Sequence, residues 1–223
     1  MKINVKTLFT VIKSIGIIIA FIIMAGACKK TDFPGANPQS IISDSIKTIL
    51  FIGNSLTYTN ELPKLVEAIG KERGIEIKTT MIAFPNYALE DHWNDGRIQT
   101  LIADKKYDFV VVQQGPSSQS DGSISLIEYG AKIKEICSAS NSQLAFFMVW
   151  PAFANFHTYS GVINSYTNAA IATNSILCPV GQVWRDYFLA TGDYAYFGPD
   201  MFHPSLKGSE NAALIIFQIL FQG

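Results

Sequence analysis

The sequence predicts an α/β fold, a flavodoxin-like three-layer α/β/α sandwich around a five-stranded parallel sheet. Two observations support this prediction. Short apolar runs alternate along the chain with segments of helical length, which is the order typical of a parallel sheet with helices on both faces. The runs are also rich in apolar and β-branched residues throughout, which suits strands that are buried on both sides.

The individual elements follow from the local pattern. Five apolar and β-branched runs are the expected strands, at 48–52, 76–83, 108–113, 143–150 and 176–180. Four segments between and after them are the expected helices, at 62–73, 125–138, 159–174 and 208–221. Ligands of such sheets bind outside the carboxyl ends of the strands. We therefore expect the residues after the first strand and at the end of the third to meet at one edge.

The first 27 residues have the layout of a secretory signal peptide. Lysines precede the apolar run 15–24, and the small residues Ala25–Ala27 then stand directly before Cys28. The apolar run is shorter than the roughly 20 residues of a membrane-spanning helix. The end of this segment resembles the lipobox of bacterial lipoproteins, which implies a lipidated Cys28 and a lipid anchor in the membrane of the bacterial cell envelope, at the periplasmic or outer-membrane surface. The alternative is an ordinary cleaved signal with an incidental cysteine.

Residues 28–47 are expected to form a tether and residues 48–223 a single domain. The tether is rich in turn-forming residues and has no sustained periodicity. With 17 basic and 18 acidic residues the net charge is −1, so the chain offers no basic field for nucleic acid. Two further cysteines, Cys137 and Cys178, fit either a disulfide of an oxidising compartment or two buried free thiols.

Two short segments at opposite ends of the domain offer a nucleophile and its base. Gly53–Leu56 (GNSL) follows the first expected strand, and Asp200–Pro204 (DMFHP) stands near the C-terminus. A serine is a good nucleophile when a histidine takes its proton and a carboxylate orients that histidine. Asp200 and His203 are three residues apart, so one turn can direct the histidine between Asp200 and Ser55. Ser55 alone could merely cap the helix after it, but the distant Asp–His pair favours catalysis.

These two segments resemble the first and fifth blocks of the SGNH hydrolases, also called the GDSL esterase and lipase superfamily. The resemblance spans most of residues 48–223, with Asn54 where many members have aspartate. It implies the SGNH hydrolase fold and a set of roles. Ser55 would be the nucleophile and would donate its own amide to the oxyanion, His203 would be the general base, and Asp200 would orient His203.

The middle of the chain departs from the family pattern. The segment Phe84–Trp93 resembles a branch with two glycines before an aromatic residue, but Pro85 and Asn86 stand in the glycine places. Proline has no N–H, whereas asparagine has one and tolerates a positive φ. Gln113 stands where the family has an asparagine and carries the same carboxamide on a longer side chain. The resemblance thus implies an oxyanion hole made by the amides of Ser55 and Asn86 and the side chain of Gln113.

Motifs of several other enzyme classes are missing. The sequence has no Gly-x-Ser-x-Gly elbow and neither of the glycine-rich phosphate-binding fingerprints. Its histidines lack a metal-ligand spacing, and His92 is interpreted as a structural or pocket-wall residue. We therefore expect neither a metal nor an organic cofactor.

The expected function is that of a serine esterase that works through a Ser-His-Asp triad and an acyl-enzyme. O-acetyl groups on carbohydrates are the expected substrates, because the superfamily includes many carbohydrate deacetylases and a tethered external hydrolase meets glycans. Aromatic residues crowd the predicted loops and can stack on sugar rings. Two alternatives stay open: a lipase or acyl-esterase for longer chains, and a catalytically weak glycan-binding lipoprotein with the same fold.

Overall fold

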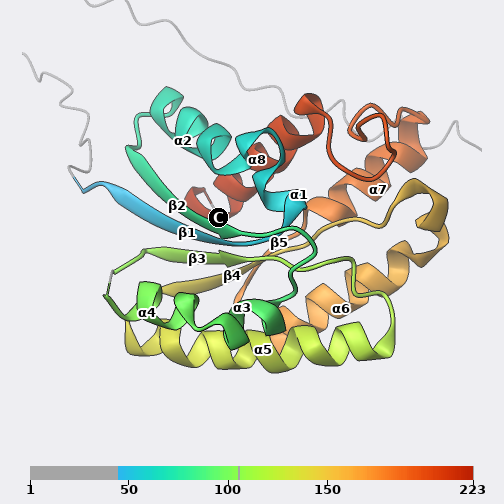
Figure 1. Ribbon diagram of the computed structural model, residues 1–223. Helices are drawn as coiled ribbons and strands as arrows, with labels where there is room; N and C mark the ends of the chain where they lie inside the picture. The colour runs from blue at the N-terminus through green and yellow to red at the C-terminus, as the bar shows by residue number, and fades with distance from the viewer. Residues whose placement is uncertain (1–44, 105, 223) are drawn as a thin grey trace, which may run out of the picture. The chain divides into compact units, whose positions relative to one another are not determined.

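A computed structural model describes residues 45–104 and 106–222, which are built around a five-stranded parallel sheet (Figure 1). The strands are β1 (Lys47–Gly53), β2 (Ile77–Ala83), β3 (Phe109–Val112), β4 (Gln143–Phe147) and β5 (Ile176–Cys178). Their order across the sheet is β2-β1-β3-β4-β5, and every neighbouring pair is parallel. This is the flavodoxin-like order, so the predicted fold class is confirmed.

Helices cover both faces of this sheet (Figure 1). The long helices are α2 (Leu62–Glu72), α5 (Ser120–Ala139), α6 (Tyr159–Ala172), α7 (Val180–Thr191) and α8 (Leu206–Phe221). The shorter ones are α1 (Ser55–Tyr58), η2 (Thr59–Glu61), α3 (Leu89–Asp95), α4 (Arg97–Asp104) and η3 (Phe153–Thr158). Helices α2 and α8 pack together on one face, and α3, α4, α5 and α6 lie on the other.

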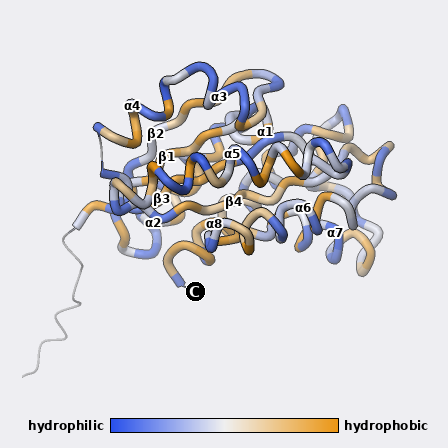
Figure 2. Tube along the Cα trace, turned by 90° about the horizontal axis from the view of Figure 1, so that it is seen from below, coloured by the Kyte–Doolittle hydropathy of each residue, from blue (hydrophilic) through white to orange (hydrophobic). Residues whose placement is uncertain are grey.

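The core lies between the sheet and these helices. Ile49–Ile52 of β1 and Val110–Val112 of β3 are almost fully buried, as are the last four residues of β4. Figure 2 shows hydrophobic strands inside and hydrophilic segments on the outer helices. Burial of each such aliphatic side chain stabilises the fold by about 1.5–3 kcal/mol. The central strands are therefore a rigid platform for whatever follows their carboxyl ends.

The direction in which successive strands are added to the sheet reverses between β1 and β3, although the two strands are parallel. Strand β1 lies between β2 on one side and β3 on the other, so the connections after β1 and β3 leave in opposite directions. Ile52 of β1 pairs with Val112 of β3, and Gln113 N–H donates to Ile52 O at 2.9 Å. The crevice outside such a topological switch point is where open α/β sheets bind ligands. Here it opens beside Asn54 and Ser55.

All five expected strands exist, with shorter ends for most of them, and the four expected helices also exist. The structure adds α1, α3, α4 and α7, which the sequence analysis did not predict. Helices α3 and α4 are short and are separated by Gly96 at φ 83°. Neither is long enough to show a recognisable helical periodicity of apolar residues. Strand β5 ends at Cys178, whereas the expected strand continued into what is the start of α7.

Several predictions concern residues outside the described part of the chain. The signal peptide 1–27, the lipidated Cys28 and most of the tether 28–47 lie there. Within the described residues, no helix combines the length and the apolar character needed to span a bilayer.

Cys137 and Cys178 are both buried and free, and burial raises the pKa of each thiol to about 12. The pair is thus two buried thiols and not a disulfide.

Candidate active site

The nucleophile turn connects β1 to α1. Asn54 caps α1 and its Oδ1 accepts the N–H of Leu56 at 3.1 Å, so Ser55 is the first residue of the helix. Gly53 must be a glycine, because a Cβ on it would overlap Thr57 Oγ1 and Gln113 Oε1. The side chain of Ser55 therefore stands at the switch point of the sheet, beyond the carboxyl end of β1.

The loop before α8 carries the acid and the base. Asp200 Oδ1 accepts the backbone N–H groups of Phe202 at 3.1 Å and His203 at 2.9 Å. Its Oδ2 lies 2.5 Å from His203 Nδ1. Met201, between them, has a φ of 57°, which closes this tight turn. The hydrogen bond from His203 lowers the pKa of Asp200 below its usual value, so Asp200 is ionised and holds the His203 proton on Nδ1.

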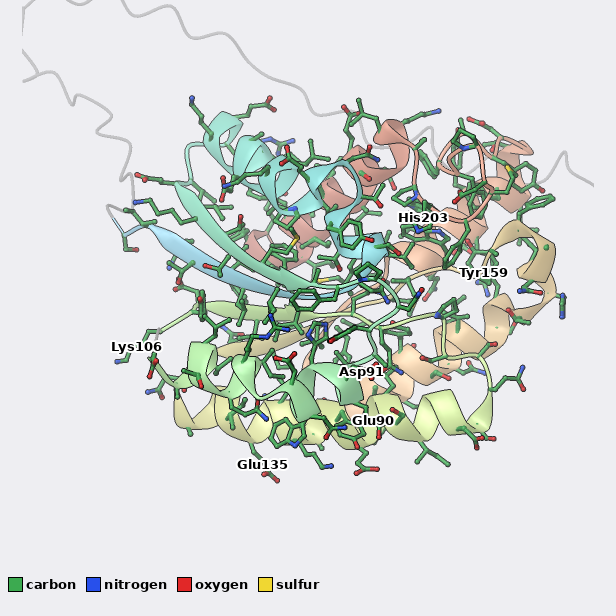
Figure 3. All side chains as sticks on the ribbon, viewed as in Figure 1. Glu90, Asp91, Lys106, Glu135, Tyr159 and His203 are labelled. Atoms are coloured by element: carbon green, nitrogen blue, oxygen red, sulfur yellow. The ribbon has the colours of Figure 1, made fainter. Side chains whose placement is uncertain are left out.

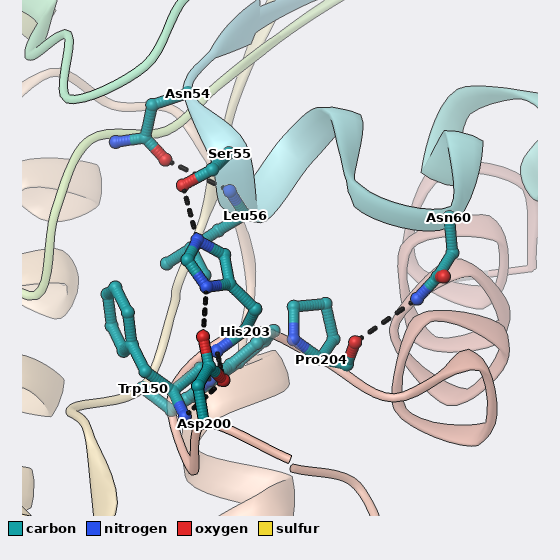
Figure 4. Close-up of polar contacts among 9 residues, drawn as sticks. Asn54, Ser55, Leu56, Asn60, Trp150, Asp200, His203 and Pro204 are labelled. Carbon is teal, nitrogen blue, oxygen red and sulfur yellow. Dashed lines mark hydrogen bonds and ion pairs between the residues drawn. The ribbon is translucent and has the colours of Figure 1, made fainter. Parts of the chain in front are cut away.

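The two segments meet through one hydrogen bond. His203 Nε2 lies 2.9 Å from Ser55 Oγ, across 148 residues of sequence (Figure 4). With its proton on Nδ1, His203 presents an unprotonated Nε2 to the Ser55 hydroxyl, which donates to it. This is the geometry of a nucleophile hydrogen-bonded to a base that a carboxylate orients. The structure thus brings together Ser55, His203 and Asp200, the three predicted catalytic residues.

The loop that carries His203 is held from several sides. Trp150 Nε1 donates to Phe202 O at 2.9 Å, and Asn60 Nδ2 donates to Pro204 O at 3.1 Å (Figure 4). Trp150 is fully buried and stacks on Trp184 with ring centroids 3.6 Å apart. The triad side chains remain accessible, with 38% of His203 and 53% of Asp200 exposed. A rigid backbone therefore carries side chains that substrate and water can reach.

A turn between β2 and α3 faces the nucleophile. Tyr87 N–H donates to Phe84 O at 3.3 Å, with Pro85 and Asn86 as the central residues and Asn86 at φ 62°. Proline at the second position and asparagine with positive φ at the third are the residues that a type II turn favours. Pro85 and Asn86 are thus compatible with a tight turn in the places where the family branch has glycines.

This turn, which we call the 84–88 turn, is tied to the nucleophile. Asn54 Nδ2 donates to Tyr87 O at 3.0 Å, and Phe84 N–H donates to Gly53 O at 3.2 Å. An aspartate at position 54 has no N–H to donate to Tyr87 O. Asn54 therefore has a specific partner that accounts for the amide at this position. Sequence reasoning noted the substitution but missed this contact.

Two free backbone donors belong to residues that line the cavity beside Ser55. Among the described residues, no hydrogen bond of the fold engages the N–H of Ser55 or of Asn86. Both residues line one cavity of about 420 Å³, together with Tyr87 and Gln114. Free N–H groups beside a nucleophile are what an oxyanion hole requires. The placement of Ser55 and Asn86 is thus compatible with their predicted roles.

The structure gives Gln113 a different place from the predicted one. Its side chain is fully buried, with Oε1 accepting the N–H of Asn54 at 3.0 Å and the hydroxyl of Thr57 at 2.8 Å. Its Nε2 donates to Asn54 Oδ1 at 2.9 Å and to Gln114 O at 2.5 Å. Both amide hydrogens are committed, so none is left for an oxyanion. The prediction of Gln113 as an oxyanion donor is therefore corrected. Gln113 stabilises the nucleophile turn through its hydrogen bonds to Asn54 and Thr57.

His92 lies behind the nucleophile turn and is only 1% exposed. Its Nε2 lies 2.8 Å from Gly53 O and donates to it, while its Nδ1 is buried without a partner. Burial lowers the pKa of His92, so its ring is neutral. The imidazole ring of His92 packs against the rings of Phe84 and Tyr87. This agrees with the interpretation of His92 as a structural residue and adds that it supports both the nucleophile strand and the 84–88 turn.

The site draws on both layers of helices. Figure 3 shows His203 on the side of the sheet that α8 covers and Asp91, on α3, on the opposite side. Asp91 Oδ2 accepts the N–H of Ala88 at 2.8 Å and so fixes the end of the 84–88 turn. In the part of the chain that the structure describes, no group of three or more His, Cys, Asp and Glu side chains has an arrangement that could hold a metal ion.

Comparisons with known proteins were made for sequence and for structure. No protein-family model and no curated protein matches the sequence. Among solved structures, a candidate SGNH hydrolase from Slackia heliotrinireducens is similar with a TM-score of 0.67 and 22% identity, covering 79% of this chain and 100% of its own. A lipase/acylhydrolase from Enterococcus faecalis has a TM-score of 0.63 and 16% identity, covering 77% and 94%.

A third similar structure is a variant of an acetyl-xylooligosaccharide esterase from Geobacillus stearothermophilus. Its TM-score is 0.58 at 17% identity, over 78% of this chain and 94% of its own. Each of the three structures is similar to more than three quarters of this chain. This chain therefore has the fold of the SGNH hydrolases.

Proposed function

We propose that this chain is a serine esterase that hydrolyses ester bonds through an acyl-enzyme on Ser55. The observation that carries the proposal is the continuous link from Ser55 Oγ through His203 to Asp200, with distances of 2.9 and 2.5 Å. A serine hydroxyl needs such a base to attack a carbonyl at neutral pH. The similar solved structures include a lipase/acylhydrolase and two esterases, which supports the same class of reaction.

In the first half of the reaction, Ser55 Oγ attacks the ester carbonyl as His203 Nε2 takes its proton. Asp200 stabilises the imidazolium that forms, because it is already ionised and bonded to Nδ1. The carbonyl oxygen, on which negative charge develops, accepts hydrogen bonds from the N–H groups of Ser55 and Asn86. Each such donor contributes about 2.7–4 kcal/mol of transition-state stabilisation. His203 then protonates the departing alcohol.

In the second half, water hydrolyses the acyl-enzyme. His203 Nε2 takes a proton from the water, which attacks the acyl carbonyl, and returns it to Ser55 Oγ as the acid leaves. The exposure of His203 and Asp200 gives water a direct path to the intermediate. The same two backbone donors stabilise the second oxyanion.

We propose acetyl esters of carbohydrates as the substrates. The cavity beside Ser55 is lined mainly by small or polar residues, among them Gly115, Ser117 and Ser125, and this favours a short acyl group over a long alkyl chain. Two of the similar structures are variants of one esterase from Geobacillus stearothermophilus, which is named an acetyl-xylooligosaccharide esterase in one case and an acetylxylan esterase in the other. A lipase would bury a long chain against a continuous set of apolar residues, whereas the larger apolar residues of this cavity are only Tyr87, Pro116 and Phe202.

We also propose that the enzyme is anchored in the cell envelope through a lipid on Cys28, with the domain at the periplasmic or outer-membrane surface. The support is the signal-like segment 1–27 with its small residues before Cys28. The N-terminal peptide of the mature protein should carry a lipid on Cys28. A Cys28→Ser variant should lose the lipid and leave the membrane fraction, and a soluble wild type would contradict the anchor.

The test of the activity is hydrolysis of 4-nitrophenyl esters by the purified domain. The acetyl ester should be the best substrate in a series from acetyl to octanoyl, and Ser55→Ala should abolish its turnover. Ser138→Ala, at an exposed serine of α5, is the matched control and should behave as the wild type. Turnover that survives in Ser55→Ala refutes the esterase mechanism. A preference for octanoyl esters would instead identify a lipase.

A further inference from the structure

A second cavity adjoins the one beside Ser55. It measures about 590 Å³, and the two cavities share Pro116 and Phe202 as walls. Phe202 directly precedes His203, and the two rings lie 5.2 Å apart. The second cavity does not include Ser55 among its lining residues. We call it the outer cavity, and the cavity beside Ser55 the inner cavity.

The chemistry of the triad distinguishes the two cavities. The oxyanion donors Ser55 and Asn86 line the inner cavity, so the carbonyl and its acyl group belong there. The leaving oxygen must face His203 Nε2, because His203 protonates it. The outer cavity is lined by Phe202, the residue directly before His203. It is therefore the adjoining space into which the alcohol part of the ester can extend.

The outer cavity offers polar hydrogen-bonding groups. Its polar lining residues include Gln119, Asn155, His157 and Thr158. Among the described residues, no hydrogen bond of the fold uses the side chains of Gln119, Asn155 or His157, so their donors and acceptors are free for a ligand. The lining contains no Lys, Arg, Asp or Glu.

The shape of the outer cavity is set by close packing of the segments around it. Gly161 at the start of α6 approaches Ser118 so closely that a Cβ would lie 2.7 Å from Ser118 O. Phe153 N–H donates to Met201 O at 2.9 Å, which ties η3 to the loop that carries the triad. The cavity is therefore a fixed part of the site, adjacent to the catalytic loop.

We infer that the outer cavity is the subsite for the leaving alcohol and that this alcohol is an uncharged sugar residue. Amide, hydroxyl and imidazole groups suit the hydroxyls of a sugar, and the ring of Phe202 gives one apolar wall on which a sugar face can lie. A phosphate-bearing headgroup or an acidic sugar would call for cationic residues, which the lining does not supply. This inference rests on the proposed esterase activity and adds where the substrate lies.

The test compares two acetyl esters that differ in the leaving group. Acetylated xylo-oligosaccharides have a sugar that reaches the outer cavity, whereas vinyl acetate has a leaving group too small to do so. The measured quantity is the ratio of kcat/KM for the oligosaccharide to kcat/KM for vinyl acetate. A triple variant, Gln119→Ala with Asn155→Ala and His157→Ala, removes three exposed side chains and is expected to fold.

The ratio should fall at least about tenfold in the triple variant, because each lost hydrogen bond weakens binding several-fold, and the loss should appear mainly in KM. Ala152→Phe, which fills the outer cavity without removing a polar group, should lower the ratio similarly. Gln218→Ala, an exposed glutamine on α8 outside both cavities, is the control and should keep the wild-type ratio.

Three results overturn the inference: a ratio that stays within twofold in both cavity variants, a parallel loss on both substrates, or a wild type that does not turn over the oligosaccharide. Failure of the proposed activity itself looks different. In that case Ser55→Ala would hydrolyse vinyl acetate as fast as the wild type does.

Discussion

The triad and its oxyanion side are built in different ways. Ser55, His203 and Asp200 form a chain of side-chain hydrogen bonds that is open to solvent. The 84–88 turn offers the free backbone N–H of Asn86 and is supported by Asn54 and His92, which are buried. The proposed reactive side chains are thus at the surface, whereas the residues that position the proposed oxyanion donors belong to the core.

The largest effect is expected at the triad. His203→Ala removes the base, so kcat should fall by roughly 10⁴–10⁶-fold, the range seen when a triad member is lost. Because His203 is at the surface, the variant should unfold at nearly the wild-type denaturant concentration. Measured kcat for 4-nitrophenyl acetate together with a urea unfolding curve checks both points. A loss smaller than tenfold would remove His203 from the mechanism.

Asp200→Asn should have the next largest effect. An amide cannot hold the proton on His203 Nδ1 in the same way, so a larger share of the imidazole takes the unproductive tautomer. Since Asp200 is half exposed, water replaces part of its effect, and we expect a loss in kcat of about 10²–10³-fold, less than the roughly 10⁴-fold of a buried triad aspartate. Kinetics of the purified variant at pH 8 measure this, and a rate near that of the wild type would contradict it.

Gln113 separates structural support from oxyanion binding most clearly, because its predicted and observed roles have different consequences for stability and for kcat. Gln113→Leu leaves the N–H of Asn54 and the hydroxyl of Thr57 without their buried acceptor, so the domain should lose about 2–4 kcal/mol of unfolding free energy. A direct oxyanion donor would instead cost kcat by about 10²–10³-fold with little change in stability. Urea unfolding and kcat, measured on the same sample, distinguish the two.

Asn86 tests the backbone side of the site. Asn86→Gly keeps the N–H and suits the positive φ of 62°, so kcat should stay within about threefold of the wild type. Asn86→Ala keeps the N–H but strains the turn, by about 1 kcal/mol. The alanine variant should therefore be the slower and less stable of the two. Equal losses in both variants would assign the function to the Asn86 side chain.

The smallest effect concerns His92 and pH. Its folded-state pKa lies below the ordinary value of 6.5 because it is buried, so below pH 6.5 the unfolded chain binds a proton that the folded chain does not. The stability due to neutral His92 is thus complete above pH 6.5 and decreases as the pH falls toward the lowered pKa. His92→Gln should flatten this decrease in unfolding free energy between pH 7 and pH 5. An unchanged slope would show that other groups cause it.

The sequence was sufficient to predict the fold and to select Ser55, Asp200 and His203, which the structure links through hydrogen bonds. Continuous apolar runs identify buried strands whatever their partners, and Gly53–Leu56 and Asp200–Pro204 each carry their chemistry within one turn. Helices α3, α4 and α7 were missed, because short helices and a helix that directly follows a strand give little periodic signal.

The oxyanion side was only partly predictable. Asn86 could be selected because a positive φ is a local property of asparagine. The role of Gln113 could not be predicted, because whether its side chain points to substrate or to the core depends on Asn54 and Thr57, which lie more than 50 residues away in sequence. The outer cavity likewise combines residues of three separate loops.

The central claim is that Ser55 is the nucleophile of an esterase, and covalent labelling measures it most directly. A 4-nitrophenyl phosphonate ester should transfer one phosphonyl group per chain to the wild-type protein, on Ser55 by peptide mass spectrometry, and esterase activity should disappear in proportion. Ser55→Ala should take up no label and show no turnover. Label on another residue, or activity that persists when Ser55 is fully modified, would contradict the account.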